Sequence, residues 1–175
     1  RLFSEGTFNA AFVPSYSSVL DNKKKSQKFA NNIFTLLTIG LFFLVLVIEI
    51  MMPIFVFLIA PGFEDDYQKM ELAITLTRIT FPFLMFISLA SFFSAILNSH
   101  NKFAVASAAP IILNILLIGV LLFGKILNDQ LVYYLSYAVT ISGLLQLIFL
   151  YFFVKKHFSP KINLLFKIDN KVKLF

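Results

Sequence analysis

Three polar residues near the start of the chain have the types and the spacing of a ligand-binding stripe. Arg1, Glu5 and Asn9 stand four residues apart, so on a helix they share one face. The segments that follow are apolar nearly all round, and charge beside such helices needs a partner or a watery cavity because desolvation is costly. The stripe therefore predicts either a lined cavity or an ordinary amphipathic surface helix.

The amino-acid composition indicates which class of protein contains this stripe. Of 175 residues, 59% are apolar and 14% charged, against roughly 45–50% and about 25% in soluble domains. Such a chain cannot cover its apolar surface in water, which predicts an all-α integral membrane protein. The absence of cysteine excludes disulfides and thiolate metal sites. No signal-peptide pattern opens the chain, and it starts mid-pattern on Arg1, so we expect a fragment.

Five apolar segments predict a bundle of five membrane crossings over residues 1–157, because roughly 20 apolar residues span a bilayer core of about 30 Å. Polar connections are expected at 20–32 and 60–78. Residues 158–175 alternate lysines with apolar side chains, which predicts a basic amphipathic helix in the cytoplasmic interface or, alternatively, a solvated end. The predicted crossings are 1–19, 33–59, 79–97, 103–123 and 131–154.

The net charge of +6 is a topology signal rather than a nucleic-acid signal, because the basic residues lie in short segments between apolar runs. Segments 20–32, 98–102 and 155–175 hold eleven lysines, whereas segments 60–78 and 124–130 hold three basic residues. The positive-inside rule places the first group in the cytoplasm. Membrane lipids are therefore the expected surroundings, and no nucleic-acid partner is predicted.

Prolines interrupt four of the predicted spans. Each proline removes a backbone donor and frees a carbonyl, which neighbours or water must then satisfy. Pro14, Pro82 and Pro110 are candidate hinges for helices that bend between two states, and static kinks are the alternative. Pro53 makes the same kind of break in the second span.

Isolated polar residues inside the spans are the next candidates. Asn114 and Gln146 are amides at mid-span depth, so both are expected to face the bundle interior, as interhelical hydrogen-bond partners or as cavity-lining residues. Asn9 is a third candidate for cavity lining. The small and polar face formed by Ser88, Ser91, Ala95 and Asn98 is interpreted as helix packing, with cavity lining as the alternative.

Titratable residues give no pattern of catalysis. Glu49 lies deep in an apolar run, where a carboxylate is a candidate for proton or ion coupling, although it could also reach the outer headgroups. His100 and His157 are expected to be isolated, without the paired spacing of a metal site. No phosphate-binding loop or nucleophile elbow is present. The sequence predicts a non-enzymatic protein with no metal and no cofactor.

Several sequence blocks together form a recognisable pattern. The first is residues 1–14, RLFSEGTFNAAFVP. The other blocks are 60–63, 79–82, 87–91, 96–98, Phe103 with 109–110 and Asn114, and 138–140 with Gly143 and Gln146. These blocks resemble the MurJ/MviN family of lipid II flippases, in the multidrug/oligosaccharidyl-lipid/polysaccharide exporter superfamily, whose pattern for the first block is R-(I/L)-F-A-E-G-A-F-x-x-A-F-V-P. The resemblance runs over about residues 1–165.

The resemblance implies about fourteen helices in two lobes around a cationic cavity, in the bacterial inner membrane. This chain would supply about helices two to six of the N-terminal lobe and the start of the segment joining the lobes. The implied activity is alternating-access transfer of lipid II, the undecaprenyl-diphosphate-linked peptidoglycan precursor, from the inner to the outer leaflet for cell wall synthesis. Arg1 and Glu5 match family positions in the cavity, where arginine can bind a diphosphate.

Two alternative functions are also consistent with the sequence. Another exporter of the same superfamily, for polysaccharide-lipids or drugs, would share the fold. A non-transporting scaffold for wall synthesis would instead act through its basic tail. Ala106 departs from the family pattern, which commonly has a second proline there, so we expect a weaker bend before Pro110.

Overall fold

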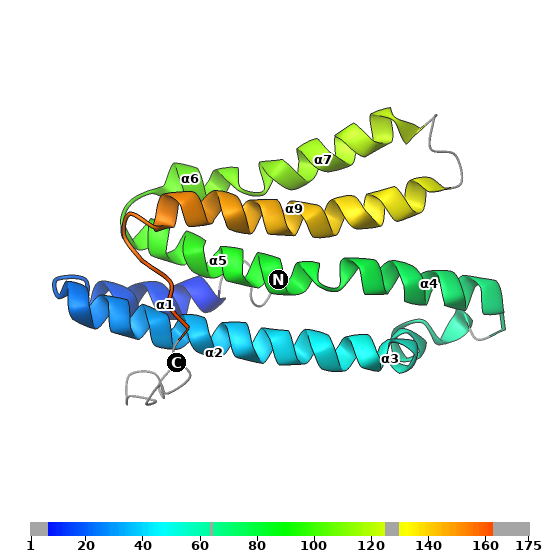
Figure 1. Cartoon of the computed structure of the whole chain (residues 1–175), viewed down its shortest axis with the longest axis horizontal. Coiled ribbons are helices and arrows are strands. Elements are labelled where there is room, and N and C mark those ends of the chain that lie inside the picture. Colours follow the sequence, from blue (N-terminus) through cyan, green and yellow to red (C-terminus); the bar gives the residue numbers. More distant parts are fainter. Residues whose placement is uncertain (1–6, 64, 125–129, 163–175) are drawn as a thin grey trace.

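A computed structural model of the chain describes residues 7–63, 65–124 and 130–162, and every regular element within these ranges is a helix (Figure 1). Four helices in this part of the chain are long and apolar enough to cross a membrane. The predicted all-α, polytopic membrane fold is confirmed. The elements are α1 (Thr7–Ser17), α2 (Lys23–Ile50), α3 (Met52–Ile59), the 3-10 turn η1 (Pro61–Phe63), α4 (Tyr67–Thr80), α5 (Phe83–Ser99), α6 (Phe103–Ala108), α7 (Ile111–Leu122) and α9 (Leu131–Val154).

Side-chain caps fix where two of the long helices begin. The Asn22 side chain accepts a hydrogen bond from the backbone N–H of Lys25, so α2 starts at Lys23. In the same way, the Asp66 side chain accepts from the backbone N–H of Lys69 and starts α4. Asp66 also pairs with the Lys69 ammonium at 2.9 Å. Both helices consequently extend further than their apolar runs alone predict.

Prolines divide three apolar stretches into pairs of helices. Pro53 is in the first turn of α3, Pro82 separates α4 from α5, and Pro110 separates α6 from α7. A proline is accepted at a helix start, where no backbone donor is needed, and ends the helix before it. Pro14 behaves differently, because α1 continues through it.

The predicted spans and the observed helices differ mainly at their ends. Residues 23–32 and 67–78, expected as parts of polar connections, are helical. The last predicted span, 131–154, coincides with α9. Of the first predicted crossing, the structure describes only α1, and the tail beyond residue 162 lies outside the described residues. Those two predictions remain predictions.

Helix α5 is the centre of the bundle, and it packs against α9, α1, α2 and α6. Its C-terminal half is buried, and Phe92 there contacts Phe12 of α1 and Phe34 of α2 at ring-centroid distances of 5.2 and 5.7 Å. At its other end, α5 approaches α9 closely because Gly143 has no side chain. The Cβ of an alanine at position 143 would lie 2.6 Å from the Phe83 ring.

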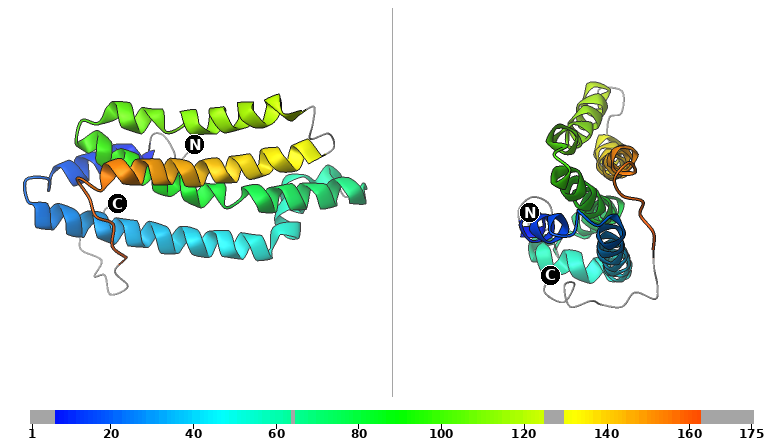
Figure 2. Two further views of the ribbon diagram at one scale, coloured as in Figure 1. Left: turned by 45° about the horizontal axis from the view of Figure 1, so that its top comes forward. Right: turned by 90° about the vertical axis from the view of Figure 1, so that its left-hand side faces the viewer.

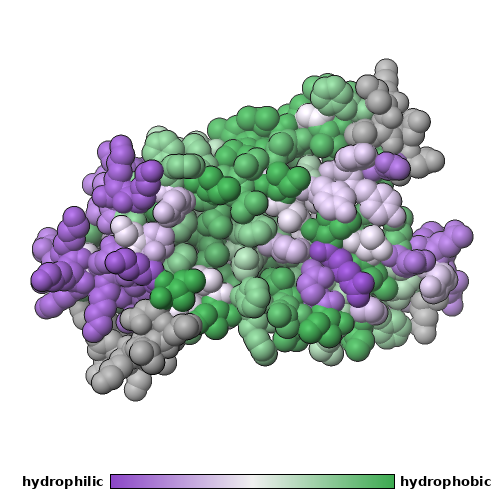
Figure 3. All heavy atoms as spheres, viewed as in Figure 1, coloured by the Kyte–Doolittle hydropathy of each residue, from purple (hydrophilic) through white to green (hydrophobic). Residues whose placement is uncertain are grey.

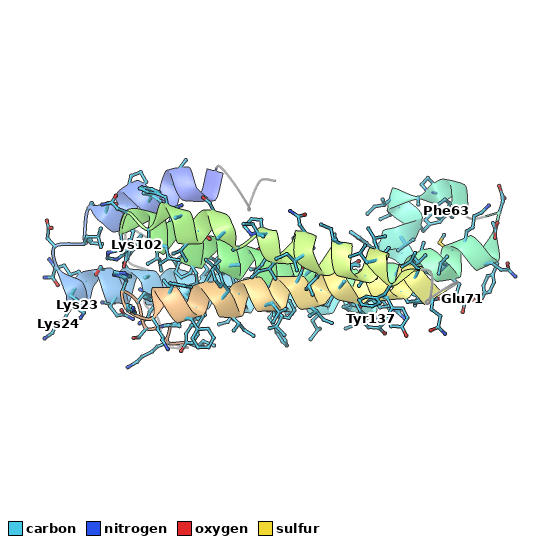
Figure 4. The ribbon with its side chains drawn as sticks, turned by 90° about the horizontal axis from the view of Figure 1, so that it is seen from above. Lys23, Lys24, Phe63, Glu71, Lys102 and Tyr137 are labelled. Atoms are coloured by element: carbon cyan, nitrogen blue, oxygen red, sulfur yellow. The ribbon has the colours of Figure 1, made fainter. Side chains whose placement is uncertain are left out.

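The surface follows the pattern expected of a membrane protein. Figure 3 shows a broad hydrophobic middle region and hydrophilic atoms gathered at both ends of the molecule. Figure 4 places Lys23, Lys24 and Lys102 at one end, and Phe63 and Glu71 at the other. The long helices run side by side between these ends in the left view of Figure 2, and the right view shows them nearly end-on. The lysine-rich end is the end that the positive-inside rule assigns to the cytoplasm.

Candidate functional site

A polar hollow of about 410 Å³ lies between α5, the α6–α7 pair and α9. Serines and amides converge on it from three of these helices, while apolar side chains form the remaining wall. This combination of an apolar wall and a few convergent polar groups is typical of ligand pockets. Its polar lining residues are Ser91, Ser94, Asn98, Ser107 and Gln146.

The small residues of α5 open the hollow on one side. Ser91, Ser94 and Asn98 stand three and four residues apart, so they share a helix face. The sequence pattern predicted that Ser91 and Asn98 belong to a packing face, with cavity lining as the alternative. The structure shows both, because Ser91 is buried within the bundle and also lines the hollow.

Pro110 shapes the opposite side. The break between α6 and α7 lies at the hollow, and both Ser107 and Pro110 line it. Because proline has no N–H, the last turn of α6 keeps carbonyl groups that no helical donor satisfies. Ser107 has no counterpart among the sequence predictions, since a single serine in a short helix carries no periodic signal.

Gln146 lines the hollow from α9, and its side chain has an unsatisfied hydrogen-bond donor. Its exposed fraction is 1%, and its Nε2 has no hydrogen-bond partner in the structure. A buried amide donor without an acceptor lowers the stability of the fold by about 1–3 kcal/mol, so we expect such a group to serve a function. Gln146 is therefore the lining residue that is the strongest candidate for a hydrogen bond to a group that enters the hollow.

Of the other predicted binding and cavity residues, the structure places only the side chain of Asn114. Arg1 and Glu5 are outside the described residues, and the structure describes only the backbone of Asn9, on α1. Asn114 is on α7 with an exposed side chain and does not line the hollow. The structure thus brings Gln146 and Pro110 together and leaves Asn114 apart from them.

A second polar cluster lies at the lysine-rich end, where sequence reasoning expected isolated histidines. That expectation was wrong: His100, after α5, and His157, after α9, stack with ring centroids 4.2 Å apart. Burial and the neighbouring charge of His157 together hold the pKa of His100 below its usual value. Its Nε2 is buried without a hydrogen-bond partner. No sequence signal connects two histidines that are 57 positions apart.

The chain after α9 is held against α2 by two side-chain amides, which we call the amide clasp. Gln27 donates to the carbonyl of Ser159 and accepts from its N–H, and Asn31 accepts from the N–H of Lys161 at 2.9 Å. Phe158, with 1% exposure, anchors the same segment in the aromatic core. Figure 1 shows this segment, in orange, leaving α9 and crossing to α2.

In the described part of the chain, no group of three or more histidine, cysteine, aspartate or glutamate residues is placed to hold a metal ion. The hollow is lined by hydroxyls, amides and apolar groups, and it contains no titratable side chain. What this arrangement offers is hydrogen bonding to a neutral or anionic group rather than acid–base chemistry.

Comparison with known proteins identifies the family. The sequence profile described as "Lipid II flippase MurJ" matches residues 1–175. The chain belongs to this family. A "Probable lipid II flippase MurJ" of Rickettsia prowazekii (strain Madrid E) is 38% identical over 158 residues, covering 89% of this chain and 31% of that protein.

Two further relatives give the same result. The "Probable lipid II flippase MurJ" of Rhizobium tropici is 38% identical over 172 residues, 95% of this chain and 32% of that protein. The "Lipid II flippase MurJ" of Burkholderia cenocepacia is 34% identical over 148 residues, 83% of this chain and 29% of that protein. This member of the MurJ family therefore spans about a third of the length of the curated relatives it matches.

Proposed function

We propose that this chain forms part of a transporter that moves lipid II from the inner to the outer leaflet of the bacterial cytoplasmic membrane. The match of the flippase profile to residues 1–175 carries this proposal. The membrane-spanning helices, with basic residues concentrated at one end, support it. Transport by alternating access, for peptidoglycan synthesis, is the corresponding mechanism.

Arg1 and Glu5 are proposed as the substrate-binding pair. A diphosphate inside a membrane needs charge-assisted donors, and the planar arginine fork supplies several in a fixed geometry. Glu5, four residues further along the chain, can hold the guanidinium in place and exchange it with the phosphates. Both residues precede α1, which packs against the central helix α5.

Gln146, Asn9 and Asn114 are proposed as cavity-lining residues, on different grounds. The unpartnered Nε2 of Gln146 supports a role in contacting a polar group of the substrate. Asn114 is exposed on α7, so its proposed role requires a further surface beside that helix. Pro82 and Pro110, each between two helices, are proposed hinges; Pro14, which does not interrupt α1, is proposed as a hinge on its sequence position alone.

The test is a chimera in which this chain replaces the matching part of a complete flippase. After the resident flippase is shut off, lipid II in the outer leaflet is measured by the amount that an externally added cleaving enzyme reaches. We expect the chimera to maintain this pool and Arg1→Ala to lower it, because the diphosphate loses its cationic partner. Lys102→Ala, which removes an exposed cation from a turn, is the matched control and should change nothing.

Two outcomes would contradict the proposal. Full transport with Arg1→Ala would exclude the cationic role of Arg1. A chimera that reaches the membrane in normal amount but leaves the outer leaflet without lipid II would show that this chain serves another substrate. Accumulation of a different lipid-linked sugar in the inner leaflet would then identify an exporter of another kind.

A further inference from the structure

Glu49 is a carboxylate that the proposed transport role leaves unused. It lies in the last turn of α2, inside the 28-residue helix that is long and apolar enough to cross a membrane. One of its carboxylate oxygens is buried and has no hydrogen-bond partner. An ionised carboxylate at such a position is strongly disfavoured unless a cation or a proton compensates it.

Arg78 of α4 is the charged group that acts on Glu49 electrostatically. The described residues contain an ion pair shorter than 4.0 Å at Lys69–Asp66 and none between Arg78 and Glu49, so these two charges attract each other without direct contact. The helices that pack most extensively against α2 are α1, α3 and α5, and they contain no charged residue; on α4, Lys69 and Glu71 lie about two or more turns from Arg78. Arg78 is therefore the charged residue that stabilises the ionised form of Glu49. Figure 3 shows a hydrophilic patch over α4 and α2 within the hydrophobic middle region.

The two charges lie beside two helix breaks that pack against each other. Glu49 comes just before the break at Met51, which precedes Pro53, and Arg78 comes one turn before the break at Pro82. Phe55 and Phe81 join the breaks through an edge-to-face contact, with ring centroids 5.5 Å apart. Helix α3 packs along α4 beside this contact. The breaks that flank Glu49 and Arg78 are thus in direct contact.

We propose that Glu49 is an intramembrane proton-binding site whose occupancy is set by Arg78 across the two breaks. When Arg78 approaches, its charge favours the carboxylate and the proton leaves. When Arg78 withdraws, the carboxylate takes up one proton and becomes a neutral carboxylic acid, which the apolar surroundings favour. By linkage, proton uptake must in turn favour the arrangement in which Arg78 is more distant. This site does not depend on the identity of the transported substrate.

Infrared spectroscopy of the chain in lipid bilayer discs tests the site directly. A protonated carboxyl has a carbonyl band that the carboxylate lacks, and isotope labelling of glutamate isolates the four glutamates from the aspartates. Exposed glutamates protonate near about pH 4.3, so we expect, beside their band, a labelled component with its own midpoint that is lost in Glu49→Gln. In Arg78→Gln the midpoint of that component should rise, because a favourable charge is removed.

Glu71→Gln is the matched control, since Glu71 is an exposed carboxylate on α4, and it should leave the band and its midpoint unchanged. Helix content by circular dichroism checks that each variant is folded. If Glu49→Gln fails to fold, Arg78→Gln and the charge-preserving Arg78→Lys still test the proposal through the midpoint. Survival of the separate component in folded Glu49→Gln, or a midpoint of that component that Arg78→Gln leaves unmoved, would overturn the proposal.

Discussion

At the level of single residues, the fold contains buried polar atoms without hydrogen-bond partners, and each of them lowers the stability of the fold. Gln146 is the clearest case, because the residue lines a polar hollow and its buried amide Nε2 has no hydrogen-bond partner. In a protein selected for stability alone, an apolar side chain of similar size would be favoured. The residue is therefore expected to trade stability for binding.

Replacing Gln146 by methionine should separate these two effects. The substitution keeps the length of the side chain and removes the unsatisfied donor, so we expect the free energy of unfolding to stay level or to rise by about 1 kcal/mol. In the chimera, the outer-leaflet pool of lipid II should fall. Thermal unfolding and the cleaving-enzyme assay measure the two quantities, and lowered stability with unchanged transport would indicate a purely structural glutamine.

The stacked histidines predict a dependence of stability on pH. The lowered pKa of His100 means that, on acidification, the unfolded chain takes up a proton before the folded chain does. The stability contributed by the neutral side chain is present above the unfolded pKa, about 6.5, and is lost as pH falls below it towards the folded pKa. Both histidines lie at the end of the molecule where the chain leaves α9.

Hydrogen exchange checks this dependence locally. Backbone amides near positions 100 and 157 should exchange faster at about pH 5.5 than at about pH 7.5, after correction for the intrinsic rate. His100→Phe retains an aromatic ring for the stack and removes the titrating group, so it should reduce the difference. An equally large difference in that variant would assign the effect to another group.

At the level of helices, the sequence predicted the apolar segments and their interruptions well. The prolines at positions 53, 82 and 110 predict the three breaks because proline cannot donate a backbone hydrogen bond. Helix starts were predicted less well, since the caps Asn22 and Asp66 extend α2 and α4 into polar sequence. A hydropathy pattern detects the membrane core and not the helical turns beyond it.

The contact between α5 and α9 gives a prediction with an internal control. Gly143→Ala should lower the free energy of unfolding by about 1–3 kcal/mol, because its Cβ would lie 2.6 Å from the Phe83 ring and 3.2 Å from the Phe86 Cβ. Gly119→Ala on α7 meets nothing within 4 Å and should be neutral or stabilising. Thermal unfolding of both variants measures the difference, and equal midpoints would contradict the tight packing at Gly143.

At the level of the whole molecule, charge asymmetry predicts orientation. The hydropathy pattern predicted the class of fold, and the lysine distribution predicts its orientation in the membrane. Neither could identify which side chains meet in the interior. The hollow around Gln146 and the stack of His100 on His157 both join residues from distant segments. Such contacts depend on helix rotation and kink geometry, which apolar helices with no polar face leave undetermined.

The orientation can be tested with single cysteines, because the chain contains none of its own. Gly62→Cys, in the connection between α3 and α4, should react with a membrane-impermeant maleimide in intact cells. Ser18→Cys, at the lysine-rich end, should react only after permeabilisation. The opposite labelling pattern would reverse the predicted topology.

The amide clasp has a consequence for which changes this chain tolerates. Gln27 and Asn31 bind only backbone atoms of Ser159 and Lys161, so the side chains at those two positions can vary without loss of the hydrogen bonds. The length of the segment between α9 and the clasp cannot vary in the same way. An inserted or deleted residue would move a different N–H or carbonyl opposite each amide and pull Phe158 from the core. The clasp therefore tolerates other side chains at positions 159 and 161, but not a change in the number of residues that precede them.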